Sequence, residues 1–175
     1  CEEIVANSGL NYTLVRASWF NQNFNEGAFT DYVLAGTMAL PMPQASVPFV
    51  DTNDIADVVT EVLLNDAYNS ETITVTGPKK LTFQEVAEII SNKLGRTIRY
   101  QPISLEEFKE GLKGAGVPDS YIWLLSYLFT EVLAYSENQA VSNDVQRVLN
   151  REPISFEAYA DRTASSGVWN QDVTV

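Results

Sequence analysis

The 175-residue sequence contains no histidine and a single cysteine, Cys1. Without histidine there is no imidazole general base, no histidine-containing catalytic triad and no imidazole metal ligand. One cysteine excludes an internal disulfide bond. No apolar run approaches the roughly 20 residues that a membrane-spanning helix needs. We therefore expect a soluble, cytoplasmic protein without a metal site and without a membrane partner.

Basic residues are also scarce. The chain has 11 Lys and Arg against 23 Asp and Glu, a formal net charge of −12, and its pI is about 4.3. Binding to nucleic acid requires clustered Lys and Arg that displace counterions from phosphates, so nucleic-acid partners are excluded. With 45% hydrophobic and 19% charged residues, the composition is that of a globular segment long enough to bury one substantial core.

The start of the chain indicates a longer parent. It begins at Cys1 without an initiator Met, inside a predicted amphipathic helix that ends at Asn7-Ser8-Gly9. We expect a fragment or a processed chain.

Strand and helix signals alternate along the sequence. Strands are predicted at 12–15, 47–50, 72–76 and 97–100, the first of them covered on both faces of a parallel sheet. Helices are predicted at 29–34, from the cap at 51–54 to 64, at 82–93, from 104, and after Ser142 and Ser155, and the segment 121–134 is strongly apolar and aromatic. Thr82 with Glu85 and Ser104 with Glu107 fit the capping box, and Gly95 is predicted to stop the helix at 82–93. The helix ending at residue 64 should bury one apolar face, made of Ile55, Val58, Val59, Val62 and Leu63. An α/β fold follows.

Two motifs suggest ligand chemistry but fit a structural role better. Gly111, Gly114 and Gly116 form a G-x-x-G-x-G string, yet a phosphate loop needs a strand before it and a helix after it, whereas these glycines follow a helix. They predict a helix end and turn. Asp51 and Asp54 could suggest Ca²⁺, but the long calcium loop is absent, and helix capping is the stronger interpretation.

No acid/base pair is visible. Tyr12 and Arg16 have the spacing of a helical Tyr-x-x-x-Lys pair, but on a strand the two residues lie about 13 Å apart. The sequence therefore identifies no catalytic residue.

The loop after the first strand is the best-placed segment for a ligand. In open α/β sheets ligands bind outside the carboxyl ends of the strands, where Ala17 to Asn23 follow. Ordinary packing of Trp19 and Phe20 is the alternative. The apolar segment 121–129 is likewise open to two interpretations, a core helix or the wall of a pocket or partner interface.

Taken in order, several motifs resemble one family. They are Ser8-Gly9-Leu10 with the strand to Arg16, Phe20 and Asn23, the segment 49–56, Thr76-Gly77-Pro78 with Leu81-Thr82, Leu94-Gly95-Arg96, and finally 151–156 with Trp169. This pattern resembles the C-terminal half of NmrA-like atypical short-chain dehydrogenases/reductases, including the NAD(P)H:quinone oxidoreductase type.

The resemblance implies the C-terminal part of a Rossmann-type NAD(P)-binding fold with a small α/β substrate lobe. Residues 1–76 would supply the last strands and helices of the sheet, and 77–175 a mainly helical substrate lobe, with the N-terminal phosphate-binding half absent. Ala17, Ser18, Trp19, Phe20 and Asn23 would bind the nicotinamide side of the cofactor, and Phe49 and Tyr127 the substrate. The family usually has Pro at position 17 and often Gly at position 18.

The function implied is NAD(P)H-dependent reduction of a quinone or similar small carbonyl substrate by the parent protein. Alternatives are an NmrA-like dinucleotide-binding regulator without turnover and a noncatalytic interaction fragment. NAD(P)H would bind the intact parent, and this chain alone no tighter than about millimolar. An unpaired sheet edge would drive self-association of the isolated chain.

Overall fold

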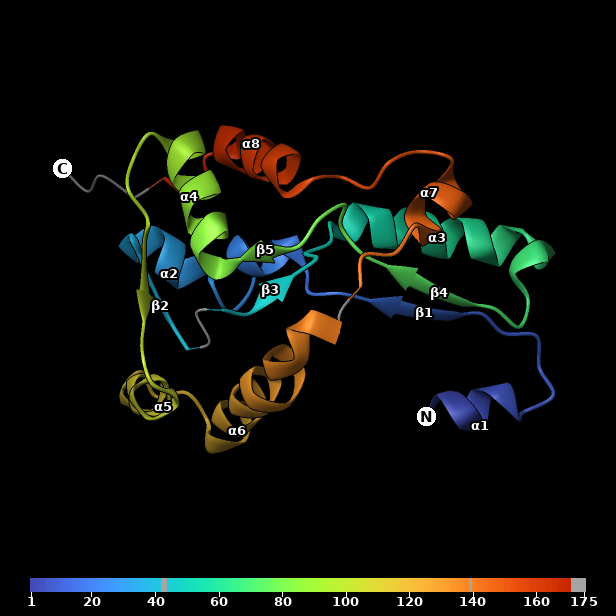
Figure 1. Ribbon diagram of the computed structural model, residues 1–175, viewed down its shortest axis with the longest axis horizontal. Helices are drawn as coiled ribbons and strands as arrows, with labels where there is room; N and C mark the ends of the chain where they lie inside the picture. The colour runs from blue at the N-terminus through green and yellow to red at the C-terminus, as the bar shows by residue number, and fades with distance from the viewer. Residues whose placement is uncertain (42–43, 139, 171–175) are drawn as a thin grey trace.

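The computed structural model describes residues 1–41, 44–138 and 140–170. The Pro41-Met42-Pro43 sequence predicts a bend, and Met42 and Pro43 lie outside the described residues. The predicted α/β class is confirmed, with helices interspersed among short, mostly parallel strand pairs (Figure 1). None of the helices in these ranges combines the length and apolarity needed to cross a bilayer.

Strands β1 (Leu14–Ala17) and β4 (Thr72–Val75) form a parallel pair at one end of the molecule (Figure 1). Val15 lies opposite Ile73 in the register, and both face an apolar cluster shared with α3 (Thr52–Leu64) and α7 (Asp144–Leu149). The helix α1 (Glu2–Ala6) precedes this pair, and η2 (Asp66–Tyr68) connects α3 to β4.

Two expectations for this unit were wrong. The first strand is not covered on both faces: Leu14 and Val15 are half-buried, and Arg16 and Ala17 are exposed. The apolar face of α3 is narrower than predicted, because only the side that meets the strands and α7 is packed. Val58 is fully buried, whereas Leu63 is 78% exposed and Val59 36% exposed. Within the described residues β1 pairs only with β4, so its other edge carries no strand.

A second unit surrounds a large aromatic core. Strands β2 (Thr37–Leu40) and β6 (Arg99–Pro102) pair in parallel, and β3 (Ser46–Val47) pairs antiparallel with β5 (Leu81–Thr82). The strand predicted at 97–100 therefore lies two residues later, and that predicted at 47–50 is reduced to β3 and a bridge from Val50 to Phe20. β2 and β5 were not predicted. The helices of this unit are η1 (Asn21–Phe24), α2 (Thr30–Ala35), α4 (Phe83–Leu94), α5 (Leu105–Gly114), α6 (Asp119–Tyr127) and α8 (Phe156–Ser166).

The two predicted capping boxes are confirmed. Thr82 and Glu85 exchange both capping-box hydrogen bonds at the start of α4, and Ser104 and Glu107 do the same for α5. Gly95 ends α4 in the left-handed conformation. The G-x-x-G-x-G string ends a helix, as expected, because α5 runs through Gly114 and the chain then turns.

The two cores do not divide at residue 76. The larger core joins Phe24, Phe29 and Phe49 to side chains of α4, α5 and α8, while the smaller joins α7 to β1 and β4. Each core thus draws on both sequence ranges. After α6, a π-helical turn η3 (Leu128–Val132) and a 3₁₀ segment η4 (Leu133–Asn138) carry the chain back toward the carboxyl ends of β1 and β4.

Candidate functional site

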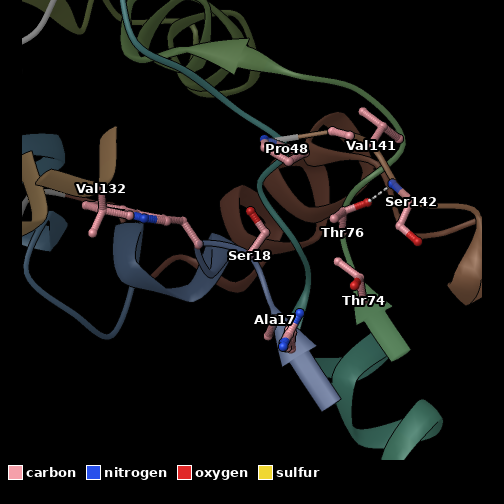
Figure 2. Close-up of a pocket in the computed structure, with 11 residues that line it drawn as sticks. Ala17, Ser18, Pro48, Thr74, Thr76, Val132, Val141 and Ser142 are labelled. Carbon is pink, nitrogen blue, oxygen red and sulfur yellow. Dashed lines mark hydrogen bonds between the residues drawn. The ribbon is translucent and has the colours of Figure 1, made fainter. Parts of the chain in front are cut away.

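A cavity of about 590 Å³ lies at the carboxyl ends of β1 and β4 (Figure 2). This is the edge of an open α/β sheet where ligands bind. Its wall is assembled from β1 and the loop that follows, from β4, and from the segment around η4 and α7. The lining residues are Arg16, Ala17, Ser18, Trp19, Pro48, Thr74, Thr76, Val132, Ala140, Val141 and Ser142.

Hydroxyl groups form the polar part of the wall. The Thr76 hydroxyl accepts a hydrogen bond from the Ser142 backbone N–H (3.0 Å), and the Ser142 hydroxyl accepts one from Asp144 N–H (3.1 Å). The buried Ser18 hydroxyl has no hydrogen-bond partner among the described residues. In Figure 2, Ser18 lies between Val132 on one side and the Thr76–Ser142 pair on the other. Ser18 is thus a lining residue whose buried hydroxyl has no hydrogen-bond partner among the described residues.

The apolar part of the wall is rigid. The Trp19 ring stacks on Phe29, with centroids 6.1 Å apart and an interplanar angle of 7°, and its edge and face also meet Phe83 and Phe129. Trp19 therefore packs against the aromatic core and also lines the cavity, and its contact with a cofactor or substrate stays a prediction. A ring held on three sides cannot swing away, so it offers a fixed apolar surface.

Arg16 is the one ionisable side chain among the described lining residues. Its guanidinium donates to both carboxylate oxygens of Glu2 on α1. The hydrogen bonds from Arg16 lower the pKa of Glu2. The cavity can therefore bind and orient a ligand through hydroxyls and an aromatic surface, but these residues hold no carboxylate, amine or thiol for proton transfer.

The loop that carries Ser18 and Trp19 is anchored by a buried carboxylate. Asp51, fully buried, caps α3 by accepting from Asn53 N–H at 3.0 Å, accepts from the Gln22 side chain at 3.0 Å and pairs with Arg162 at 2.6 Å. The Gln22 amide oxygen in turn accepts from Thr52 N–H. The predicted capping role of Asp51 is confirmed, and it also ties the site loop to α3 and α8.

Sequence reasoning missed the arginine partners of this motif. Arg162 lies 111 positions from Asp51, and Arg151 lies 97 positions from Asp54, with which it pairs at 2.6 Å. Nothing local in the sequence marks such long-range pairs. Asn21 belongs to the predicted ligand loop but was not among the predicted cofactor-binding residues. It is fully buried, and neither polar atom of its side chain has a partner among the described residues.

The structure brings together three of the predicted site residues. Ala17, Ser18 and Trp19 line the cavity. Phe20 and Asn23 do not appear among the lining residues: Phe20 is 42% exposed and bridges Val50, and Asn23 lies half-buried in η1. Both belong to the short turn that follows the cavity wall, so they shape the loop.

The two predicted substrate residues lie elsewhere. Phe49 is 2% exposed and packs among Phe24, Phe83 and Phe156 in the larger core. Tyr127 is 46% exposed on α6. Neither residue belongs to the described lining of the cavity, and their roles in substrate binding stay predictions.

Comparisons with known proteins agree with this architecture. Among curated proteins, the chain is 31% identical over 165 residues to prestalk A differentiation protein A of Dictyostelium discoideum, covering 94% of this chain and 54% of that protein. It is 30% identical over 170 residues to an NAD(P)H azoreductase of Xenophilus azovorans, covering 94% of this chain and 57% of that protein. The chain thus spans about half the length of these curated relatives.

Solved structures share the fold. The chain superposes with a TM-score of 0.82 on an NADPH-dependent quinone oxidoreductase of Escherichia coli complexed with NADPH, at 19% identity over 92% of this chain and 56% of that one. It superposes with a TM-score of 0.60 on the negative transcriptional regulator NmrA in complex with NAD, at 16% identity over 94% of this chain and 56% of that one. The fold is therefore the Rossmann-like NAD(P)-binding type. The model of the NmrA-like family matches residues 1–160, and the chain belongs to the NmrA-like family.

Proposed function

We propose that the protein is an NAD(P)H-dependent oxidoreductase that reduces a quinone or a similar small carbonyl compound in the cavity at the carboxyl ends of β1 and β4. The observation that carries this proposal is the pairing of a fixed Trp19 surface with the unpartnered Ser18 hydroxyl in one cavity. A planar ring lies against an aromatic surface, and an oxygen on that ring accepts a hydrogen bond from a hydroxyl.

The lining suits the nicotinamide end of NAD(P)H. It is uncharged apart from the paired Arg16, and its Ser18 hydroxyl is an orphaned polar group that a carboxamide or a carbonyl would satisfy. The pyrophosphate has no comparable site in the described residues, since the chain's glycine string ends α5. NAD(P)H supplies the hydride when it is bound.

The chain's own residues would orient the reactants. Ala17, Ser18 and Trp19 would border the nicotinamide, while Phe20 and Asn23 hold the turn beneath them. The Ser18 hydroxyl would donate to the ring oxygen that gains negative charge during reduction. Pro48, Val132 and Val141 would exclude water from the opposite side.

The test is oxidation of NADPH with a simple benzoquinone by the protein as the cell makes it, followed by loss of NADPH absorbance. Ser18→Ala should lower kcat/KM about tenfold, because one hydrogen bond to the reacting oxygen is lost. Ser165→Ala is the matched control: Ser165 is exposed on α8, and its hydroxyl bonds only within its own helix. Absence of quinone-dependent oxidation would contradict the proposal.

A dinucleotide-binding regulator is the second candidate. It is favoured by the lack of a proton-transferring acid or amine among the described lining residues. NADPH binding without turnover on quinones or other carbonyl compounds would select this function over the first.

A further inference from the structure

Arg16 stands on the face of the β1–β4 pair that borders the cavity. Side chains alternate between the two faces of a strand, and Val15 and Ile73 face the smaller core. Arg16 therefore lies on the opposite face, where it lines the cavity. The Ser18 N–H continues the ladder by donating to Val75 O at 3.0 Å, which keeps Ser18 on the same face as Arg16. Arg16 and Ser18 thus belong to one wall of the cavity.

The guanidinium of Arg16 is only partly used. Its Nε donates to one carboxylate oxygen of Glu2 at 2.9 Å, and its Nη2 donates to the other. The Nη1 group, which carries two N–H donors, makes no hydrogen bond within the described residues. Because the side chain is 57% exposed, a ligand can reach this edge. A guanidinium edge with unused N–H groups has the fork geometry that binds a carboxylate or a sulfonate.

Glu2 holds this arginine weakly. Its carboxylate stands on α1, a helix of five residues with no buried residue, and the Glu2 side chain is itself 46% exposed. An ion pair between two exposed side chains contributes little to stability. Arg151 and Arg162, by contrast, pair with carboxylates that are fully buried. Glu2 can therefore share the guanidinium with a second anion.

Charge favours an anionic group of the ligand at Arg16. The chain has a net charge of −12, so its field repels anions over most of the surface. None of the lining residues that the structure describes is a carboxylate, and Arg16 is the ionisable side chain among them. An anion that enters this cavity finds a partner there, whereas a cation finds none.

We infer that Arg16 selects substrates that carry a carboxylate or sulfonate, with the anion on Arg16 and the reacting carbonyl on Ser18. The inference rests on the proposed function and names its substrate class. Two residues of extended strand, about 6.6 Å, separate the two Cα atoms, which with the reach of the arginine suits one substituted ring between them. The quinone gains a hydride from NADPH and a proton from water and leaves as the hydroquinone, so Arg16 binds the substrate without taking part in the chemistry.

Two matched quinones test the inference. One is a trimethyl-1,4-benzoquinone with a carboxymethyl arm, and the other is its methyl ester, so they differ by one negative charge. For the protein as the cell makes it, kcat/KM should be about tenfold higher with the acid than with the ester at low salt, mainly through a lower KM. This ratio should shrink at high salt, because the Arg16 side chain is exposed and its charge is screened.

Substitutions of Arg16 and Glu2 should act in opposite directions. Arg16→Gln should bring the ratio of acid to ester to about one, and Arg16→Lys should keep part of it, since lysine retains the charge but not the fork. Glu2→Gln should raise the ratio about threefold, because a competing carboxylate is removed. Arg99→Gln is the matched control: it removes the same charge from an exposed arginine on β6, outside the described lining, and should keep the wild-type ratio.

Binding without turnover separates this inference from the proposed function. Titration calorimetry of the acid and the ester, with NADP⁺ in place of NADPH, gives their Kd ratio even if neither is reduced. A tighter Kd for the acid that Arg16→Gln abolishes would support the inference, and absence of NADPH oxidation would then contradict the proposed function alone.

Three results would overturn the inference. The first is an equal Kd of the wild type for the acid and the ester. The second is a loss of the preference in Glu2→Gln, which would make the pair with Arg16 purely structural. The third is a higher KM for NADPH in Arg16→Gln with the preference for the acid intact, which would assign Arg16 to a phosphate of the cofactor.

Discussion

At the residue scale, buried carboxylates hold the segments around the site together. Asp54 is fully buried, pairs with Arg151 at 2.6 Å and accepts from Ile154 N–H at 2.7 Å. A buried charge is tolerated only when such partners replace its water. Asp51 does the same with Arg162 and Gln22. The segment 51–54, which the sequence pattern assigns to helix capping, therefore also binds the C-terminal part of the chain through ion pairs to Arg151 and Arg162.

Asp54→Ala should destabilise the fold by about 3 kcal/mol, because Arg151 and the Ile154 N–H lose their shared acceptor. Asp57→Ala removes the other carboxylate that Arg151 contacts, but this side chain is 58% exposed, and the change should cost under about 1 kcal/mol. Urea unfolding of the two variants measures the difference. Equal losses would show that burial of Asp54 does not matter.

At the element scale, α7 closes the outer edge of β4. The Asp144 carboxylate at the start of α7 accepts from Thr74 N–H at 2.8 Å, where a neighbouring strand would otherwise accept. Burial alone would raise the pKa of Asp144, but hydrogen bonds from Thr74, Arg147 and Ser142 outweigh it and lower the pKa. Since Thr74 lines the cavity, this contact also fixes one wall of the site.

The lowered pKa predicts how stability depends on pH. A carboxyl group with a lower pKa when folded stabilises the protein above its unfolded pKa of about 3.9, and this contribution is lost as the pH falls through the folded value. Asp144→Asn should therefore reduce stability near neutral pH and flatten its decline below about pH 4. Thermal unfolding from pH 7 to pH 3 measures both effects. An unchanged acid limb would contradict the role of Asp144.

Helix capping gives a second prediction at this scale. Thr82→Ala removes the hydroxyl that accepts a hydrogen bond from Glu85 N–H, which is the Thr82 half of the capping box. The change should reduce the free energy of unfolding by about 1 kcal/mol. Thr60→Ala, on the exposed face of α3, should change stability by less than about 0.5 kcal/mol. A loss for Thr82→Ala no larger than that for Thr60→Ala in chemical denaturation would contradict the prediction.

At the scale of the whole molecule, the two cores meet where β4 ends. A Cβ built on Gly77 would stand 2.0 Å from the Phe49 carbonyl oxygen, and Gly77 N–H donates to Pro48 O at 3.2 Å. The neighbouring Val50 belongs to the smaller core, and Phe49 belongs to the larger. The backbones of the two units touch here, and only glycine permits that approach.

Gly77→Ala should therefore separate the two units and cost about 3 kcal/mol or more, because backbone has to move. Gly111→Ala is the control: nothing lies within 4 Å of its added Cβ in α5, and alanine should stabilise that helix by about 0.5–1 kcal/mol. Thermal melts of the pair should move in opposite directions. Similar shifts of the two melting temperatures would show that the backbone around Gly77 can accommodate a Cβ.

The sequence by itself determined the features that depend on neighbouring residues. The two capping boxes, the end of α4 at Gly95, the cap at Asp51 and the strand at 72–75 are short-range, and each appears where the pattern indicated. The family motifs also predicted that Ala17, Ser18 and Trp19 lie beside a ligand. All three line the cavity, because the loop after a parallel strand lies at the edge of the sheet where ligands bind.

Only the tertiary structure decided the features that depend on contacts between residues far apart in the sequence. β2 became a strand because β6, about 60 residues later, supplies its hydrogen bonds, and Leu63 stayed exposed because no described element packs on that side of α3. Phe49 packs in the larger core. Arg151 and Arg162 pair with the carboxylates of Asp54 and Asp51, which lie about 100 residues earlier in the chain. Side-chain periodicity records which faces are apolar, but the partner that covers each face is chosen only when the chain folds back on itself.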